Sequence, residues 1–182
     1  MSDAAEKLMN VDEFLVWAEG REGNWELHDG AAVLMAPERI RHTFVKTNAA
    51  IALANAVRRA GVRCLALSEG VTVRVAARRA FVPDASVLCP PPGDDELTTA
   101  NPLIVVEVLS PSTAAFDHGA KLEGYFSLAS LAHYLLIDPD RRVLIHHSRG
   151  RGDVIETRIL HEGAVRLDPP GLAFDVGELF GD

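Results

Sequence analysis

The sequence predicts a mixed α/β (α+β) fold in which a mixed central β-sheet is flanked by helices. Helical and strand-like segments alternate in the order helix, hairpin, helix, several strands, helix and further strands. Most of the strand-like segments are short, apolar and bounded by Gly, Pro or Asp. The length of 182 residues and the 48% hydrophobic content are sufficient for one packed core. We therefore expect a single domain over residues 10–182, preceded by a flexible N-terminus at residues 1–9.

The N-terminal part predicts a short helix followed by a β-hairpin. Asn10 fits the N-cap of a capping box, and the helix is expected to run to about Glu19. Asp29-Gly30 suits a two-residue type I′ turn between strands at residues 25–28 and 31–36.

A long helix is predicted from Glu38 to about Ala60, and Gly61 is expected to end it. Helical periodicity predicts that one apolar face packs on the sheet. The positions assigned to that face are Ile40, Phe44, Ile51, Ala54 and Val57.

The remainder is predicted to consist mostly of strands. They are expected at residues 62–67, 71–75, 80–88 (one bent strand or a strand pair around Pro83), 103–109, 133–138, 143–147 and 154–160. A turn at residues 110–116 leads into a helix that ends near Ala129, and a last helical turn is expected at residues 176–180.

Composition and charge exclude several classes of protein. A net charge of −8 argues against a protein that coats nucleic acid nonspecifically. The longest apolar runs are only strand-length, so we expect no transmembrane helix and no membrane partner. Cys64 and Cys89 are too few for a disulfide scaffold. We expect them to be buried reduced thiols, which fits a cytoplasmic protein.

Positive charge is concentrated between residues 36 and 82. This segment has nine basic and two acidic residues, so its net charge is +7 and that of the remaining chain is −15. Such a distribution is compatible with a surface that faces phosphates. A solvated helix face and a charged hairpin loop explain it as well, and both interpretations stay open.

Two carboxylates occur in apolar surroundings. Glu107 lies in the strand predicted at residues 103–109, where an unpaired buried carboxylate is strongly destabilising. Asp84 follows Pro83 within another apolar segment. A salt bridge to an arginine would explain Glu107, and hydrogen bonds from backbone N–H groups would explain Asp84. Together, on neighbouring strands, the two also fit the oxygen ligands of a Mg²⁺ site.

Lys121 is the candidate cation beside these carboxylates. It follows Asp117 by four positions, which favours a helical ion pair, and Asp117 also fits an N-cap. The functional interpretation places the Lys121 ammonium near a metal ion, where it orients or deprotonates the attacking water. Zinc-site spacings, a nucleophile elbow and a P-loop are absent from the sequence.

Six motifs together resemble the Uma2 family, also called DUF820, of the PD-(D/E)xK restriction-endonuclease-like superfamily. They are Trp-Glu-Leu-His-Asp-Gly (25–30), Met-Ala-Pro-Glu-Arg (35–39) followed by His42, Val-Pro-Asp-Ala-Ser-Val (82–87), Val-Val-Glu-Val-Leu-Ser-Pro-Ser-Thr (105–113), Asp-x-x-x-Lys-Leu (117–122) and Tyr-Leu-Leu-Ile-Asp-Pro (134–139). The resemblance implies a restriction-endonuclease-like fold and hydrolysis of nucleic acid, with DNA favoured. It also implies a Mg²⁺ or Mn²⁺ cofactor and a homodimer or higher homo-oligomer.

The same resemblance implies roles for individual residues. Asp84, Glu107 and the backbone carbonyl of Val108 are the implied metal ligands. The lysine expected two residues after Glu107 is replaced by Leu109, and Lys121 on the following helix is the implied substitute. Secondary candidates near the site are Glu26, Glu38, His42 and Asp117. A structural hydrogen bond explains His42 as readily as a catalytic role.

Two other functions stay open on this sequence. A catalytically silent nuclease-fold protein could act as a binding or interaction module, and the acidic composition modestly favours that alternative. A hydrolase of another class could use paired carboxylates on a small organic substrate, which predicts a deep apolar pocket.

Overall fold

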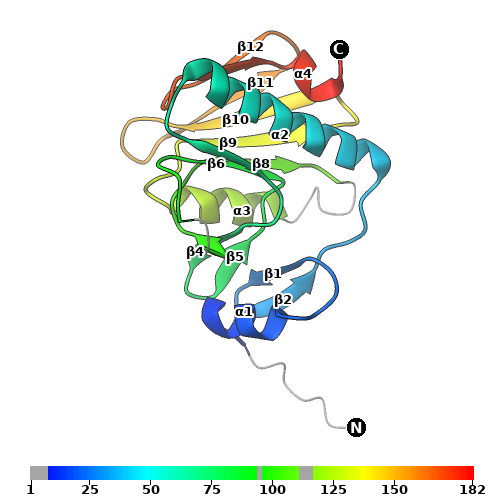
Figure 1. The fold of residues 1–182 in the computed structure, drawn as a ribbon, viewed down its shortest axis with the longest axis vertical. Helices are drawn as coiled ribbons and strands as arrows, with labels where there is room; N and C mark the ends of the chain where they lie inside the picture. The colour runs from blue at the N-terminus through cyan, green and yellow to red at the C-terminus, as the bar shows by residue number, and fades with distance from the viewer. Residues whose placement is uncertain (1–7, 94–95, 111–116) are drawn as a thin grey trace.

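The structure is a computed structural model that describes residues 8–93, 96–110 and 117–182 (Figure 1). The helices in these residues are α1 (Val11–Ala18), α2 (Ile40–Ala60), α3 (Asp117–Phe126) and α4 (Gly177–Phe180). The strands are β1 (Trp25–His28), β2 (Ala31–Leu34), β3 (Leu65–Ser68), β4 (Thr72–Ala76), β5 (Arg79–Phe81), β6 (Ala85–Leu88), β7 (Thr98–Thr99), β8 (Pro102–Val108), β9 (His133–Asp138), β10 (Val143–Arg149), β11 (Ile155–Leu160), β12 (Ala164–Leu167) and β13 (Leu172–Asp175). The predicted mixed α/β class is therefore confirmed.

A six-stranded mixed sheet, in the order β11-β10-β9-β8-β6-β3, forms the centre of the fold. Its strands β8 and β9 are parallel and are connected through α3, as parallel neighbours require a crossover. The helices α2 and α3 lie on opposite faces of this sheet (Figure 1). Both faces of β8 are therefore covered, as its apolar sequence predicts, and its Val105 and Val106 belong to different core clusters.

A five-stranded sheet, in the order β2-β1-β5-β4-β7, lies beside the central sheet together with α1. The predicted capping box at Asn10 is confirmed, since its side chain accepts from the amide of Glu13 and its own amide donates back to Glu13. The predicted turn is also confirmed: Asp29 and Gly30 both have positive φ angles, of 50° and 92°, as a type I′ turn requires.

The N-terminal segment and the turn after β8 fall largely outside the described residues. Of the flexible N-terminus expected at residues 1–9, residues 1–7 lie outside the described residues. Met9 is described, and its amide donates a hydrogen bond to the carbonyl of Gly30 at 2.8 Å. Of the turn expected at residues 110–116, residues 111–116 lie outside the described residues.

The buried face of α2 differs from the predicted one. Ile40, Phe44 and Ile51 are exposed, whereas Val45, Ala49, Ala52, Leu53 and Ala56 pack on the sheet. Small alanines allow the helix to lie close to the strands. His42 and Lys46 share this buried face. The predicted face is therefore wrong for three of its five positions, whereas Val57 packs against the core as predicted.

The expectation of reduced thiols is wrong, since Cys64 and Cys89 form a disulfide. The strands β3 and β6 are antiparallel and pair Leu65 with Leu88, so the two cysteines lie opposite each other just beyond these strands. Their Cα atoms are 4.5 Å apart, which is the spacing of a non-hydrogen-bonded antiparallel pair. Both residues are only half-buried. The cytoplasmic expectation therefore loses the support that reduced thiols gave it.

Of the two alternatives predicted for residues 80–88, the strand pair is the one observed, and its strands β5 and β6 belong to different sheets. Other short elements depart from the prediction. The strands β7, β12 and β13 are not predicted by the sequence pattern. Val165 and Leu167 of β12 cover the core beside α2, and α4 follows as predicted.

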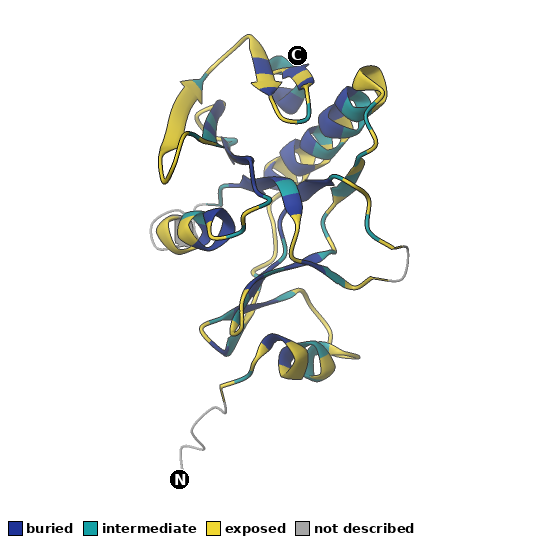
Figure 2. Ribbon diagram, turned by 90° about the vertical axis from the view of Figure 1, so that its left-hand side faces the viewer, coloured by how far each residue is buried: buried dark blue, intermediate teal, exposed yellow. Residues whose placement is uncertain are grey.

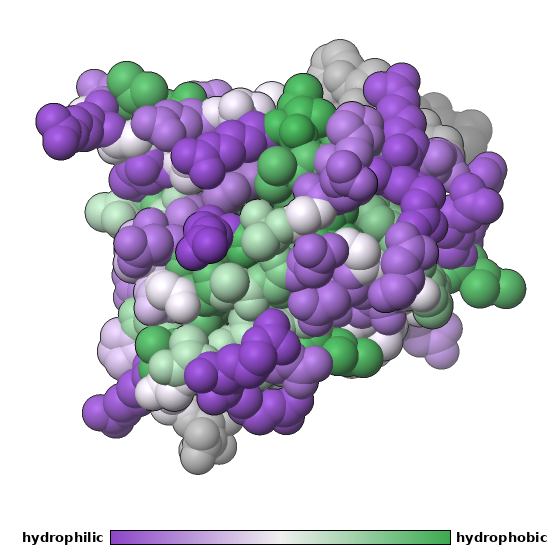
Figure 3. Space-filling view, turned by 90° about the horizontal axis from the view of Figure 1, so that it is seen from above, coloured by the Kyte–Doolittle hydropathy of each residue, from purple (hydrophilic) through white to green (hydrophobic). Residues whose placement is uncertain are grey.

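The outer surface around these last elements is largely polar. Seen from the end where β12 and α4 lie, hydrophilic side chains dominate and hydrophobic patches show between them (Figure 3). Among the described helices, none combines the length and the apolar character needed to cross a bilayer.

The reassigned face of α2 predicts the effects of two substitutions on the same helix. Leu53 is 1% exposed and Ile51 is 53% exposed. We expect Leu53→Ala to lower the free energy of unfolding by about 2–5 kcal/mol, because it leaves a cavity against the sheet. Ile51→Ala should change it by less than about 1 kcal/mol. Urea unfolding monitored by circular dichroism measures both values, and equal effects would contradict the observed orientation of α2.

Candidate active site

The candidate site lies where β6 and β8 run side by side. Their register pairs Ala85 with Val106, so Asp84, just before β6, lies close to Glu107 in β8. The amide of Asp84 donates to the carbonyl of Val106 at 2.9 Å, and the amide of Val108 donates to Asp84 Oδ2 at 2.6 Å. These hydrogen bonds hold the Asp84 carboxylate against the end of β8.

Lys121 of α3 joins Glu107 to a second carboxylate. Its Nζ lies 3.2 and 3.1 Å from the two carboxylate oxygens of Glu107 and 2.9 Å from Glu26 Oε1 of β1. Tyr125, one helical turn beyond Lys121, donates its hydroxyl to Glu107 Oε1 at 2.7 Å. Glu26 also accepts from the amide of Val82 at 2.9 Å, and its Oε2 lies 2.9 Å from His28 Nε2. The structure therefore brings the predicted lysine to the predicted glutamate.

Burial and charge act differently on the acids of this group. Burial raises the pKa of Glu107 to about 8, because the nearby Lys121 charge offsets only part of the desolvation. Burial also raises the pKa of Glu26, but the hydrogen bond from His28 and the charge of Lys121 outweigh it and leave that pKa below its usual value. Burial and the charge of Glu107 raise the pKa of Tyr125 well above its usual value. Glu107 is thus the carboxyl that readily holds a proton near neutral pH.

A second lysine, Lys46 of α2, lies among three other carboxylates. Its Nζ lies 2.9 Å from Asp84 Oδ1, 2.5 Å from Glu38 Oε1 and 2.6 Å from a carboxylate oxygen of Glu69. Burial lowers the pKa of Lys46, but the charge of Asp84 and the hydrogen bonds to Glu38 and Glu69 raise it above its ordinary value. Lys46 therefore stays charged and neutralises part of this acidic group.

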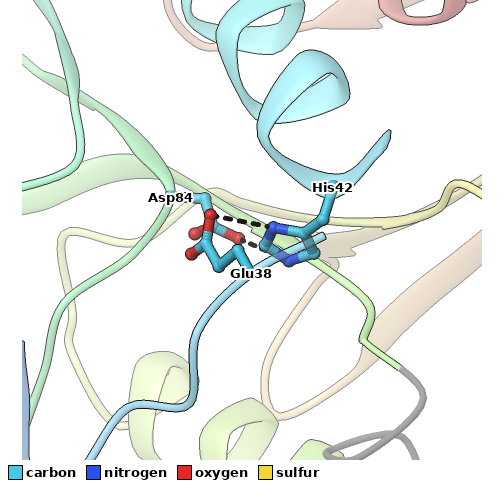
Figure 4. A group of neighbouring side chains, drawn as sticks. All are labelled: Glu38, His42 and Asp84. Atoms are coloured by element: carbon cyan, nitrogen blue, oxygen red, sulfur yellow. Dashed lines mark ion pairs between the residues drawn. The ribbon is translucent and has the colours of Figure 1, made fainter. Parts of the chain in front are cut away.

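His42 connects Glu38 to the end of β8. Its Nε2 donates to the carbonyl of Val108 at 2.7 Å and lies 4.0 Å from Asp84 Oδ2, while its Nδ1 lies 3.2 Å from Glu38 Oε2. Figure 4 shows the carboxylates of Glu38 and Asp84 next to each other on the same side of the imidazole. One ligand atom from each of Glu38, His42 and Asp84 lies within 4.8 Å of the others. These three residues form a group that could hold a metal ion.

Most of the residues predicted for the site lie together in the structure. Glu26, Glu38 and His42 all belong to the site, and the carbonyl of Val108 faces His42. This carbonyl has a second lone pair, so the hydrogen bond does not prevent it from serving as a ligand. Asp117 begins α3, but its side chain lies outside the described part of the chain. The metal roles of Asp84, Glu107 and Val108 stay predictions.

Three residues of the site were not found from the sequence. Lys46 follows His42 by four positions within α2, a spacing that places both on one side of the helix, so helical periodicity could have found it. Tyr125 follows Lys121 by four and could have been found in the same way. Glu69 lies in the turn between β3 and β4, where no local pattern indicates a role.

Three arginines of the positively charged segment form ion pairs on the surface. The pairs are Arg41 with Asp140 at 2.9 Å, Arg74 with Asp12 at 2.7 Å and Arg79 with Asp29 at 2.5 Å. Exposed pairs of this kind contribute little to stability, but each cancels a positive charge. These three pairs favour the interpretation of the segment as a solvated charged surface.

The raised pKa of Glu107 predicts a specific pH dependence of stability. In the unfolded chain Glu107 ionises near its ordinary pKa of 4.5, whereas in the folded protein its pKa is about 8. Between these pH values only the folded state keeps the proton, so this group lowers the free energy of unfolding as pH rises, by at most about 1.4 kcal/mol per pH unit.

We expect Glu107→Gln to remove this contribution, while Glu123→Gln, an exposed position of α3, leaves it unchanged. Urea unfolding in the presence of a chelator, at intervals from pH 5 to pH 8, measures the slope. If Glu107→Gln and wild type showed the same slope, Glu107 would titrate normally in the folded protein.

Comparisons with known proteins identify relatives of this chain. The chain is 27% identical over 177 residues to "Uncharacterized protein slr1290" of Synechocystis sp., covering 94% of this chain and 91% of that protein. It is 38% identical over 61 residues to "Uncharacterized protein sll1609" of the same organism, covering 32% of this chain and 34% of that one.

A solved structure and a family profile extend these matches. The crystal structure described as "a putative nuclease belonging to DUF820" from Anabaena variabilis matches with a TM-score of 0.75 at 17% identity, covering 95% of this chain and 98% of that one. The likeness confirms the fold expected from the resemblance. The profile of the Uma2 family, described as "Putative restriction endonuclease", matches residues 11–177. The chain therefore belongs to the Uma2 family.

Proposed function

We propose that this protein is a metal-dependent endonuclease that hydrolyses phosphodiester bonds of nucleic acid, with DNA as the substrate. Membership of the Uma2 family supports the reaction class. The observation that carries the proposal is the meeting of buried acids and two lysines at one junction of β6 and β8. A structural salt bridge would need only one acid and one base, whereas this junction gathers more acids than bases.

The charge balance of the site fits a divalent cation. Its five carboxylates, Glu26, Glu38, Glu69, Asp84 and Glu107, face only two lysines. Burial raises the pKa of Asp84 as well as that of Glu107, so the positive charge near these two acids does not fully offset their desolvation. Carboxylate oxygens with one imidazole nitrogen and a backbone carbonyl are suitable ligands for Mg²⁺ or Mn²⁺. Asp84, Glu38 and His42 would hold the ion, and the Val108 carbonyl, which faces His42, would be a further ligand. The role of Glu107 as a ligand is implied by the family resemblance.

When bound, the cation supplies electrostatic stabilisation of phosphate charge and acidifies water. The remaining chemistry belongs to residues of the chain. The Lys121 ammonium is held by Glu26 and Glu107, so its donors are fixed in direction and can orient water or bind a phosphate oxygen. Tyr125 fixes the Glu107 carboxyl by donating to Oε1. Glu26 and Tyr125 therefore act as positioning residues in this scheme.

A catalytically silent protein is the alternative that a specific observation favours. Lys46 lies within 2.9 Å of Asp84 and also binds Glu38, both of which are proposed to hold the cation. An ammonium in this position can satisfy the acids without a metal ion. A measurement of metal binding therefore distinguishes the metal-dependent nuclease from the catalytically silent protein.

The proposal is tested by metal binding and by cleavage of plasmid DNA. We expect Mn²⁺ to bind by titration calorimetry, and Asp84→Asn to abolish the heat because it removes a ligand. Asp84→Asn and Glu107→Gln should each reduce Mg²⁺- or Mn²⁺-dependent cleavage by about 10²-fold or more.

The matched controls are Asp153→Asn and Glu123→Gln, which change exposed acids outside the site and should leave both measurements unchanged. Circular dichroism establishes that each variant is folded. Metal binding without cleavage would support the silent alternative, and cleavage that persists in both site variants would show a contaminating nuclease.

The position of Lys46 predicts that it competes with the cation. We expect Lys46→Met to lower the dissociation constant for Mn²⁺ by about tenfold or more, because it removes a positive charge beside Asp84. Lys46→Arg keeps the charge and should not tighten binding. Calorimetry with Mn²⁺ measures all three proteins, and weaker binding by Lys46→Met would show instead that Lys46 organises the ligands.

A further inference from the structure

The strand β11 is an exposed edge strand of the central sheet. It ends the strand order β11-β10-β9-β8-β6-β3, so in the described part of the chain its outer backbone groups have no strand partner. Figure 2 shows β11 exposed at the margin of the fold, and Ile155 and Ile159 are 39% and 64% exposed. Edge strands are commonly protected from pairing with another chain by prolines, bulges or charged side chains. The sequence of β11, Ile-Glu-Thr-Arg-Ile-Leu, has no proline, and its two charged residues have opposite signs.

The order of residues in β11 is self-complementary. Counted outward from Thr157, the sequence has Glu156 and Arg158 on the two sides, and then Ile155 and Ile159. If a second β11 lay antiparallel with Thr157 opposite Thr157, every glutamate would face an arginine and every Ile155 would face an Ile159. Opposite charges and paired β-branched residues are the favourable cross-strand pairs of an antiparallel sheet.

We propose that β11 pairs with β11 of a second copy of this chain, antiparallel and about a two-fold axis at Thr157. Such a contact is isologous, because each copy presents the same surface to the other. The proposal concerns assembly and stands whether or not the protein is a nuclease.

The two faces of the sheet separate the apolar and the charged pairs. The register of β10 with β11 places Ile159 beside Ile145, and Arg158 beside His146. Because strand side chains alternate, Ile155 and Ile159 lie on one face, and Glu156 and Arg158 on the other. The apolar side of the contact would then add two isoleucines from each copy to the partly buried Ile145. Neither Glu156 nor Arg158 has an ion-pair partner among the described residues, so both are available to a second copy.

The length of the contact sets its strength. A single pair of six-residue strands is small for a protein interface, so we expect a reversible dimer that forms at micromolar concentrations. Since the charge pair occurs twice in an isologous dimer, each charge substitution acts on two contacts.

The charge pairs provide the decisive experiment. Sedimentation velocity of the full chain should show a monomer–dimer equilibrium for wild type. Arg158→Glu and Glu156→Arg should each raise the dissociation constant by about tenfold or more, because like charges then face each other twice. The double variant carrying both changes restores opposite charges and should recover dimerisation to within about threefold of wild type.

Arg63→Glu, an exposed charge change close to β3 at the opposite edge of the sheet, is the control and should leave the equilibrium unchanged. Circular dichroism of every variant excludes unfolding as the cause of dissociation. A wild-type monomer at all concentrations would overturn the proposal. A dimer that tolerates both single changes, or a double variant that fails to recover, would also overturn it.

The register is tested separately by cross-linking. Thr157→Cys places two thiols opposite each other across the proposed axis, so oxidation should give a covalent dimer. Glu162→Cys lies beyond β11, where the two copies diverge in this register, and should not cross-link. Failure of Thr157→Cys to cross-link, or equal cross-linking of both variants, would show that this register is wrong.

Discussion

The structure depends on the neutralisation of acids that are buried where β6 and β8 meet. Glu107 is 8% exposed and lies in a strand covered on both faces, so its charge cannot be solvated by water. Lys121 and Tyr125 reach it from α3, and Glu26 reaches the same lysine from β1. The two sheets and α3 are thus joined by polar contacts at a single point. Loss of one partner from such a group leaves an uncompensated buried charge, which typically destabilises a protein by about 3–5 kcal/mol.

Local sequence signals predicted the elements whose structure is determined locally. Asn10 with Glu13, and Asp29 with Gly30, act within a few residues, and both appear as predicted. The apolar strand around Glu107 was also predictable, because a strand covered on both faces has a continuous apolar sequence. That strand made Glu107 the most informative residue of the chain. Lys121 was a candidate beside it from the sequence, and the family resemblance implied its role as the substitute for the missing lysine.

What could not be predicted is determined by contacts between distant segments. The buried face of α2 contains Lys46, whose partners Glu69 and Asp84 lie 23 and 38 positions further along the chain. Periodicity treats a lysine as a solvent-facing residue, so it selected the opposite side of the helix. The disulfide was not predicted for the same reason, because Cys64 and Cys89 become neighbours only through the pairing of β3 with β6. The strands β12 and β13 were not predicted, although they are as long as β1 and β2, whose Asp29-Gly30 turn provided a local signal.

The geometry of the central sheet connects the candidate site to its exposed edge. Register pairs Glu107 with Leu136, Leu136 with Ile145, and Ile145 with Ile159, so one row of side chains on one face runs from the site to β11. A two-fold axis perpendicular to the sheet at Thr157 keeps both copies of this row on the same face. Seven strand spacings then separate the two β8 strands, which amounts to about 34 Å. Pairing through β11 would therefore join the two candidate sites through one continuous sheet, in which the twist between successive strands rotates one site relative to the other.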